Sequence, residues 1–288
     1  MRGVVNISKE NVAGDCNTKC AYSFDYQDCG LAAQNGGYNI IYGIDPIPKV
    51  PPVLYNKKQY QCSSIYIVRG SFYNKYEGSP PDAELVLLHT SLDGGANLYV
   101  CIPIIKSTDT SAATVLLSQM IKDVATRAPT NGGKIAHVDV ENFSLNSIVP
   151  KAQFYSYAKD NADCIVFGLP NAIPLSSDIL DNKLKIISSA PTQPDDTETK
   201  VFYNAIGPKS TLADQGIYID CQPTGSSGEV EVVQTRNPPV YDLDSILKDP
   251  TLYIIVQLLM SCLIFIIIYF LISYGFAFAT STNVKPKV

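Results

Sequence analysis

Histidine is scarce in this chain of 288 residues, which contains only His89 and His137. A catalytic zinc ion is usually held by three protein ligands, often imidazoles, and keeps a fourth position open for water. Two histidines cannot supply three imidazoles, so a three-histidine zinc centre is excluded. We expect both histidines to be structural, because His89 ends an apolar segment and His137 lies between two short ones.

Clusters of basic residues are also missing. No basic run is longer than Lys57-Lys58, and the formal net charge is −5. Nucleic acids, sulfated sugars and anionic lipid headgroups bind surfaces rich in lysine and arginine. The chain also lacks a glycine-rich phosphate loop and any recognisable Ser/His/Asp or Cys/His set. We therefore expect no nucleic-acid partner, no small-molecule substrate and no cofactor.

The first residues, MRGVVNISKENV, do not resemble a targeting segment. They lack the apolar stretch and the small-residue cleavage site of a secretory signal peptide. Arg2 stands where N-myristoylation requires glycine. We therefore expect the N-terminal part of the chain to be made in the cytosol and to remain there.

Charged side chains are absent from residue 250 to residue 284. Within this segment, residues 252–279 read LYIIVQLLMSCLIFIIIYFLISYGFAFA. A helix that crosses a bilayer needs about 20 mostly apolar residues. The sequence therefore predicts a transmembrane anchor at 250–280, a short tail at 281–288 and a lipid bilayer as a partner. The apolar side chains expected in the membrane include Leu252, Ile254, Leu258, Leu263, Phe265, Ile267, Phe270 and Leu271.

Three of the cysteines outside this segment, Cys16, Cys20 and Cys29, lie close together in the sequence. Their spacing is typical of the start of a zinc site, although no fourth ligand is evident nearby. A local disulfide among them is the alternative, even though disulfides are uncommon in cytosolic proteins. The residues alone leave both readings open.

The remainder of the chain reads mostly as strands. Alternation and turn signals predict strands at 37–42, 64–68, 83–89, 97–104, 154–157 and 164–167. Asp93-Gly94-Gly95 predicts a hairpin between the third and fourth of these. Apolar residues at helical spacing predict one helix at 111–127, capped by Asp109 or Thr110. A second, short helix is expected after Ser176-Ser177-Asp178, reaching Leu184.

The order of these elements resembles the α-type carbonic anhydrases from about Val4 to Leu184. Residues 66–70, YIVRG, stand where the family has a His-x-His-x-Gly strand, and residues 83–89, AELVLLH, resemble its Ala-Glu-Leu-His-x-x-His strand. The resemblance implies a mainly β (α+β) fold, with a large, twisted, mostly antiparallel sheet and a few surface helices. We accordingly expect such a domain at 1–190 and an extension with a juxtamembrane stalk at 191–249.

The chemistry of that family does not carry over to this chain. Its three zinc-ligand positions correspond to Tyr66, Val68 and Val86, none of which supplies an imidazole. Glu84 stands where the family has a carboxylate that orients a zinc ligand, and here it has no ligand to orient. The resemblance therefore implies a protein without metal, without catalytic residues and without hydratase activity.

A second resemblance concerns viral proteins. Residues 5–24, 50–56 and 99–105 look like carbonic anhydrase-like proteins of large cytoplasmic DNA viruses. A zinc-free domain on a C-terminal anchor also occurs in a poxvirus envelope protein that binds chondroitin sulfate. We therefore expect a minor structural (capsid) protein, anchored in the internal virion membrane with its domain facing the capsid. Its expected partners are capsid proteins of the same virion or further copies of itself.

During assembly the protein would reside in a host cytoplasmic membrane or one derived from the endoplasmic reticulum. The alternative is a receptor- or glycan-binding protein on the virion surface. Binding a sulfated glycan would require a basic groove, which the acidic composition does not favour.

Overall fold

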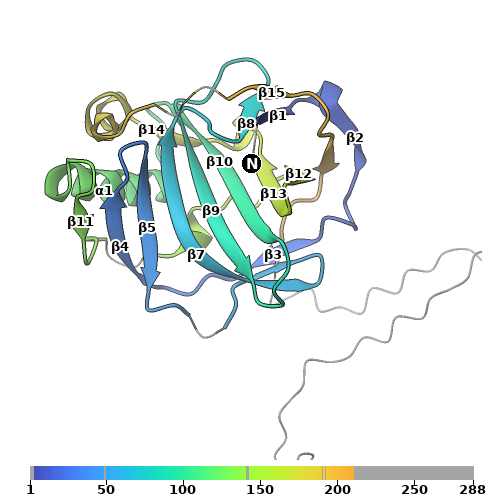
Figure 1. The fold of residues 1–288 in the computed structure, drawn as a ribbon, viewed down its shortest axis with the longest axis horizontal. Helices are drawn as coiled ribbons and strands as arrows, with labels where there is room; N and C mark the ends of the chain where they lie inside the picture. Colours follow the sequence, from blue (N-terminus) through green and yellow to red (C-terminus); the bar gives the residue numbers. More distant parts are fainter. Residues whose placement is uncertain (1–2, 49, 141–142, 190, 192, 211–288) are drawn as a thin grey trace, which may run out of the picture. The chain divides into compact units, whose positions relative to one another are not determined.

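The computed structural model describes residues 3–48, 50–140, 143–189, 191 and 193–210 (Figure 1). The predicted membrane anchor, its tail and most of the predicted stalk lie outside these residues. Among the residues that are described, no helix is long and apolar enough to cross a bilayer.

A large twisted sheet forms the centre of the domain (Figure 1). Its main path consists, in spatial order, of β11 (Lys134–Ile135), β4 (Gly30–Asn35), β5 (Asn39–Asp45), β7 (Lys58–Arg69), β9 (Ala83–Ser91), β10 (Asn97–Lys106), β13 (Ala162–Phe167), β12 (Phe154–Lys159), β16 (Val201–Asn204) and β2 (Val12–Asp15). Most neighbours pair antiparallel, as expected from the resemblance. The sheet is nevertheless mixed, because β10 pairs in parallel with β13 and with β14 (Ile173–Leu175), and β16 pairs in parallel with β2.

Shorter strands extend this sheet and form a second one. β6 (Val53–Tyr55), β3 (Tyr22–Phe24) and β17 (Lys209–Ser210) branch from β7. β15 (Asp195–Asp196), β1 (Val4–Ile7) and β8 (Asn74–Tyr76) make a small parallel sheet. Because β15, β16 and β17 follow residue 190, strand pairing continues beyond the domain boundary expected from the sequence.

The strands predicted from alternation are present, and several are longer than predicted. β9 and β10 form the expected hairpin, in which Leu98 lies opposite His89 and Ile104 lies opposite Ala83. β7 extends over 12 residues instead of five. Its N-terminal half contains polar residues that interrupt the apolar pattern, but it pairs with β6 and β9 and so remains a strand.

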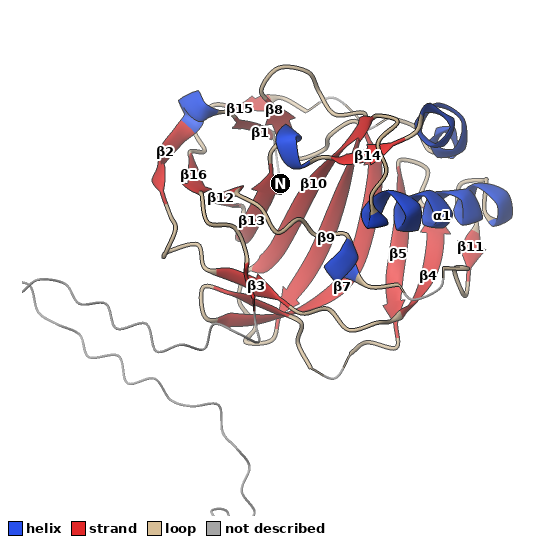
Figure 2. Ribbon diagram, turned by 180° about the vertical axis from the view of Figure 1, so that it is seen from behind, coloured by secondary structure: helices blue, strands red, loops and turns tan. Residues whose placement is uncertain are grey.

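One face of the sheet is covered by α1 (Ala112–Arg127), the predicted helix (Figure 2). Its buried stripe consists of Leu117, Met120, Ile121 and Val124, all fully buried. The predicted cap was wrong: Ser111 is the N-cap, and its Oγ accepts a hydrogen bond from the Thr114 amide at 3.1 Å.

The second predicted helix is a short π-helical and 3-10 segment instead, η4 (Asp178–Lys183) and η5 (Leu184–Ile186). The N-cap residue Ser177 makes no side-chain capping bond. The other short 3-10 segments are η1 (Lys9–Asn11), η2 (Leu145–Ser147) and η3 (Leu169–Asn171).

The sheet separates two apolar clusters. The larger one lies between the sheet and α1 and is mostly aliphatic, with Leu85, Leu87, Val100 and Ile102 from the central strands. The smaller one lies on the opposite face, which we call the pocket face. Its buried members from the central strands are Val86, Cys101, Tyr157, Cys164 and Val166.

Candidate functional site

The structure brings Tyr66, Val68 and Val86 together at one place on the pocket face. Tyr66 is the direct partner of Val86 across the β7–β9 ladder. Val68 is two residues further along β7 and therefore shares the face of Tyr66. The three positions singled out from the sequence thus form a single local site.

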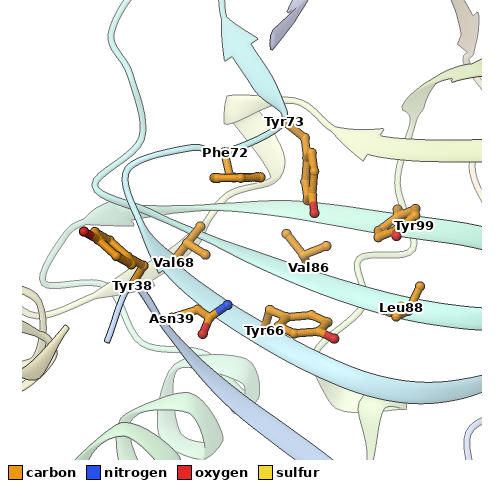
Figure 3. Close-up of a pocket in the computed structure, with 9 residues that line it drawn as sticks. All are labelled: Tyr38, Asn39, Tyr66, Val68, Phe72, Tyr73, Val86, Leu88 and Tyr99. Carbon is orange, nitrogen blue, oxygen red and sulfur yellow. The ribbon is translucent and has the colours of Figure 1, made fainter. Parts of the chain in front are cut away.

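These three side chains line a pocket of about 250 Å³ (Figure 3). In Figure 3, Val68 and Val86 occupy the middle of the pocket. Phe72 and Tyr73 lie above them, and both come from the segment between β7 and β8. The complete lining is Tyr38, Asn39, Tyr66, Val68, Phe72, Tyr73, Val86, Leu88 and Tyr99.

The lining is mostly aromatic, and its described residues include no ionisable acid or base other than tyrosine. The rings of Phe72 and Tyr73 meet edge-on with centroids 4.8 Å apart, and those of Tyr73 and Tyr99 lie 5.6 Å apart. Burial raises the pKa of the Tyr73 and Tyr99 phenols above the ordinary value. Both therefore stay protonated at neutral pH, so they can take part in hydrogen bonds without adding charge.

The residues present do not fit a zinc ion. Zinc is bound by thiolate, imidazole or carboxylate, and valine has no donor atom. Tyr66 alone cannot replace three imidazoles. No other candidate replaces this site, because the part of the chain that the structure describes contains no group of three His, Cys, Asp or Glu residues able to hold a metal.

Glu84 lies beside the pocket and is fully buried. Its Oε1 accepts hydrogen bonds from Asn74 Nδ2 and from the Tyr76 hydroxyl, both at 2.8 Å. Its Oε2 accepts from Ser71 Oγ at 3.0 Å and from the Phe72 amide at 3.2 Å. Burial raises the pKa of Glu84, and these four bonds oppose that rise.

These bonds give Glu84 a role that the sequence reasoning missed. The four donors all belong to residues 71–76, which carry Phe72 and Tyr73 over the pocket. The carboxylate therefore positions the upper wall of the pocket. The signal in the sequence was an acidic residue within an apolar strand, where an unpaired charge would be very costly.

No family model matches the chain, and no curated protein matches it.

Solved structures do resemble it. A Photobacterium profundum α-carbonic anhydrase superposes with a TM-score of 0.56 at 10% identity, covering 70% of this chain and 88% of the other. The fold is α-carbonic anhydrase-like. The Thermovibrio ammonificans α-carbonic anhydrase in complex with sulfanilamide gives a TM-score of 0.56 at 14% identity, covering 70% and 86%. Dioscorin complexed with ascorbate gives 0.54 at 18%, covering 71% and 86%. At these identities the likeness shows the fold alone.

His89 is on the opposite side of β9 from the pocket. It is fully buried, its Nε2 lies 2.8 Å from the Tyr26 hydroxyl, and its Nδ1 lies 3.3 Å from the Leu98 carbonyl oxygen. Burial lowers its pKa to about 4. His89 is therefore a neutral, hydrogen-bonded structural residue, as expected, and His137 is exposed in the loop after β11.

Cys16 and Cys20 form a disulfide, which favours the local-disulfide reading over the zinc reading. Cys29 is not part of it and remains a free thiol. Burial raises the pKa of Cys29 to about 11, so this thiol is a poor metal ligand at neutral pH.

Proposed function

We propose that the protein is a non-enzymatic minor structural protein of a large DNA virus. In this proposal, residues 250–280 anchor it in the internal virion membrane, and the carbonic anhydrase-like domain links that membrane to the capsid shell. Its partners are the bilayer and capsid proteins of the same virion.

The proposal that the protein is not an enzyme rests on which residues stand at the three positions where the resembling family has its zinc ligands. Tyr66, Val68 and Val86 all face the same pocket, and two of them have no donor atom. Hydration of carbon dioxide by this fold requires a metal-bound hydroxide, which a pocket without ligands cannot generate. A stopped-flow hydration assay with a zinc determination tests this part, and activity together with bound zinc would overturn it.

The membrane part is supported by the charge-free segment at 250–284. Confinement to a membrane raises the effective concentration of a domain, so weak contacts with a neighbouring shell are sufficient for binding. The domain also exposes large apolar side chains, among them Ile47, Val50 and Ile206, which a capsid partner would cover in this proposal.

Protease protection on intact particles tests the location, with a probe specific for residues 1–210. A domain beneath the capsid is protected until the shell is removed and is cleaved afterwards. Cleavage on intact particles would instead place the domain on the surface and favour the receptor- or glycan-binding alternative. Absence of the protein from purified particles would overturn both functions.

A further inference from the structure

We infer that the pocket over β7 and β9 binds a single uncharged aromatic ring, of the size of a phenol or an indole. The inference rests on the pocket alone and holds whether or not the protein belongs to a virion. The ring can come from a free small molecule or from an aromatic side chain of a partner protein, because both present the same chemistry.

The size of the pocket sets the first limit. Its volume is about 250 Å³. An apolar cavity of about 150 Å³ is enough for benzene, whereas pockets for drug-sized ligands start at about 300 Å³. One ring with a small substituent or one fused pair of rings therefore fills the pocket, and any further part of a ligand must lie outside it.

The shape of the lining favours a flat ring over an aliphatic ligand. Val68, Val86 and Leu88 give an aliphatic base, while Phe72, Tyr73 and Tyr99 surround it with ring faces and edges (Figure 3). Aromatic pairs in offset or edge-on contact gain about 0.5–1.5 kcal/mol beyond the apolar area they bury. A saturated ring of the same volume would lose this contribution.

The electrostatics of the lining select against charge. Among the residues that the structure describes, no lysine, arginine, aspartate or glutamate lines the pocket. Glu84, which accepts a hydrogen bond from the Phe72 amide, is already bonded to four donors. An ionised ligand would lose its hydration without gaining a counter-ion. The tyrosine hydroxyls and the Asn39 amide can still bind one hydroxyl or N–H group of a neutral ligand.

The walls are held in place before a ligand arrives. The bonds from residues 71–76 to Glu84 fix the segment that carries Phe72 and Tyr73. A preformed wall lowers the entropy cost of binding a small ligand. Arrangement, size and lack of charge thus all point to the same ligand class.

The absence of tryptophan from the chain provides a direct assay. Indole and N-acetyltryptophanamide would be titrated against the full chain in lipid nanodiscs, with indole-ring fluorescence read without interference from protein tryptophan. Empty nanodiscs serve as the blank, because indole partitions into lipid. We expect saturable binding of indole. Binding of the anion indole-3-acetate, and of non-fluorescent cyclohexanol measured by competition with indole, should be at least tenfold weaker.

The two probes separate the two sources of the ring. Tighter binding of N-acetyltryptophanamide indicates a side chain of a partner protein, since that probe carries the flanking peptide groups. Tighter binding of indole indicates a free small molecule. Absence of saturable binding of both probes up to millimolar concentration would overturn the inference.

Substitutions in the lining test whether the ring binds in this pocket. Tyr99→Ala removes one wall and is expected to weaken indole binding at least tenfold, whereas Tyr99→Phe keeps the ring and should change it less than threefold. Tyr155→Ala is the matched control, because Tyr155 lies on the same sheet face but packs against Tyr203 outside the pocket. Val68→Phe fills the pocket and should abolish binding. Unchanged binding in both Tyr99→Ala and Val68→Phe, with native circular dichroism, would contradict the assignment.

Discussion

Neighbouring residues of β9 contribute to two regions with opposite properties. Leu85 and Leu87 point into the aliphatic cluster under α1, and both are fully buried there. Glu84, Val86 and Leu88 point to the other side, where a buried carboxylate lies beside an open aromatic pocket. Because side chains alternate across a strand, one segment serves both regions. The two regions thus share a strand but differ in packing, so the residues at the pocket positions can vary without change to the aliphatic cluster.

Histidines placed at Tyr66, Val68 and Val86 should give the largest change on the pocket face. We expect the triple variant Tyr66→His, Val68→His, Val86→His to bind zinc with a dissociation constant of about 1 μM or tighter, about 8 kcal/mol of binding free energy. Competition with a chromophoric chelator measures this. The double variant without Val86→His is the control, and equal zinc binding by it would show that the three positions do not converge.

The same substitution on the two sides of β9 compares the regions directly. Leu87→Ala removes a fully buried side chain from the aliphatic cluster and should lower the free energy of unfolding by about 3 kcal/mol. Leu88→Ala enlarges an already open pocket and should cost less than about 1 kcal/mol. Urea unfolding of both variants measures the difference, and equal losses would mean that the two faces support the fold equally.

Acid should destabilise the protein through His89, which lies on the side of β9 opposite the pocket. The pKa of His89 is about 4 in the folded state, below its ordinary value of 6.5, so the unfolded chain takes up the proton more readily. Stability present above pH 6.5 is therefore lost as the pH falls towards 4, by about 3 kcal/mol from this group.

Glu84 has the opposite effect on the pH dependence of stability. Its raised pKa means that the folded state binds a proton more readily than the unfolded chain as the pH falls. Comparison of wild type with His89→Gln by urea unfolding at pH 7 and pH 4 isolates the histidine contribution. The variant should lose less stability on acidification, and an identical loss would assign the acid sensitivity to other groups.

A smaller change is expected for the carboxylate on the pocket face. Glu84→Gln places an amide NH2 against hydrogen-bond donors and should cost about 2 kcal/mol of unfolding free energy. It should also weaken indole binding, because residues 71–76 lose part of their support. Glu77→Gln on the exposed loop after β8 is the control and should change neither value.

Local patterns in the sequence were sufficient for the features that depend on local interactions. The glycine turn predicts the β9–β10 hairpin, and the apolar spacing predicts α1. The shared location of Tyr66, Val68 and Val86 followed only from the family resemblance, because pairing of β7 with β9 is a non-local contact.

No local pattern in the sequence predicts the position of the upper wall of the pocket. Phe72 and Tyr73 lie between strands, and their position depends on hydrogen bonds to Glu84, 12 residues further along the chain in the case of Phe72. The two-residue strands β15 and β17 were not predicted either, because two residues show no periodicity. Long-range pairing, which no short window of sequence displays, decides all three features.

The last described strand has a mechanical consequence. Any tension on the chain beyond Ser210 enters the domain through β17, which runs parallel to β3. Just before β17 in the chain, Asn204 Nδ2 donates a hydrogen bond to the Cys20 carbonyl at 3.1 Å. The Ala205 amide donates one to Asn17 Oδ1 at 2.9 Å. The Cys16–Cys20 disulfide closes the loop that contains these acceptors. A pulling force on β17 is therefore shared with a covalently closed loop, which reinforces this edge of the domain.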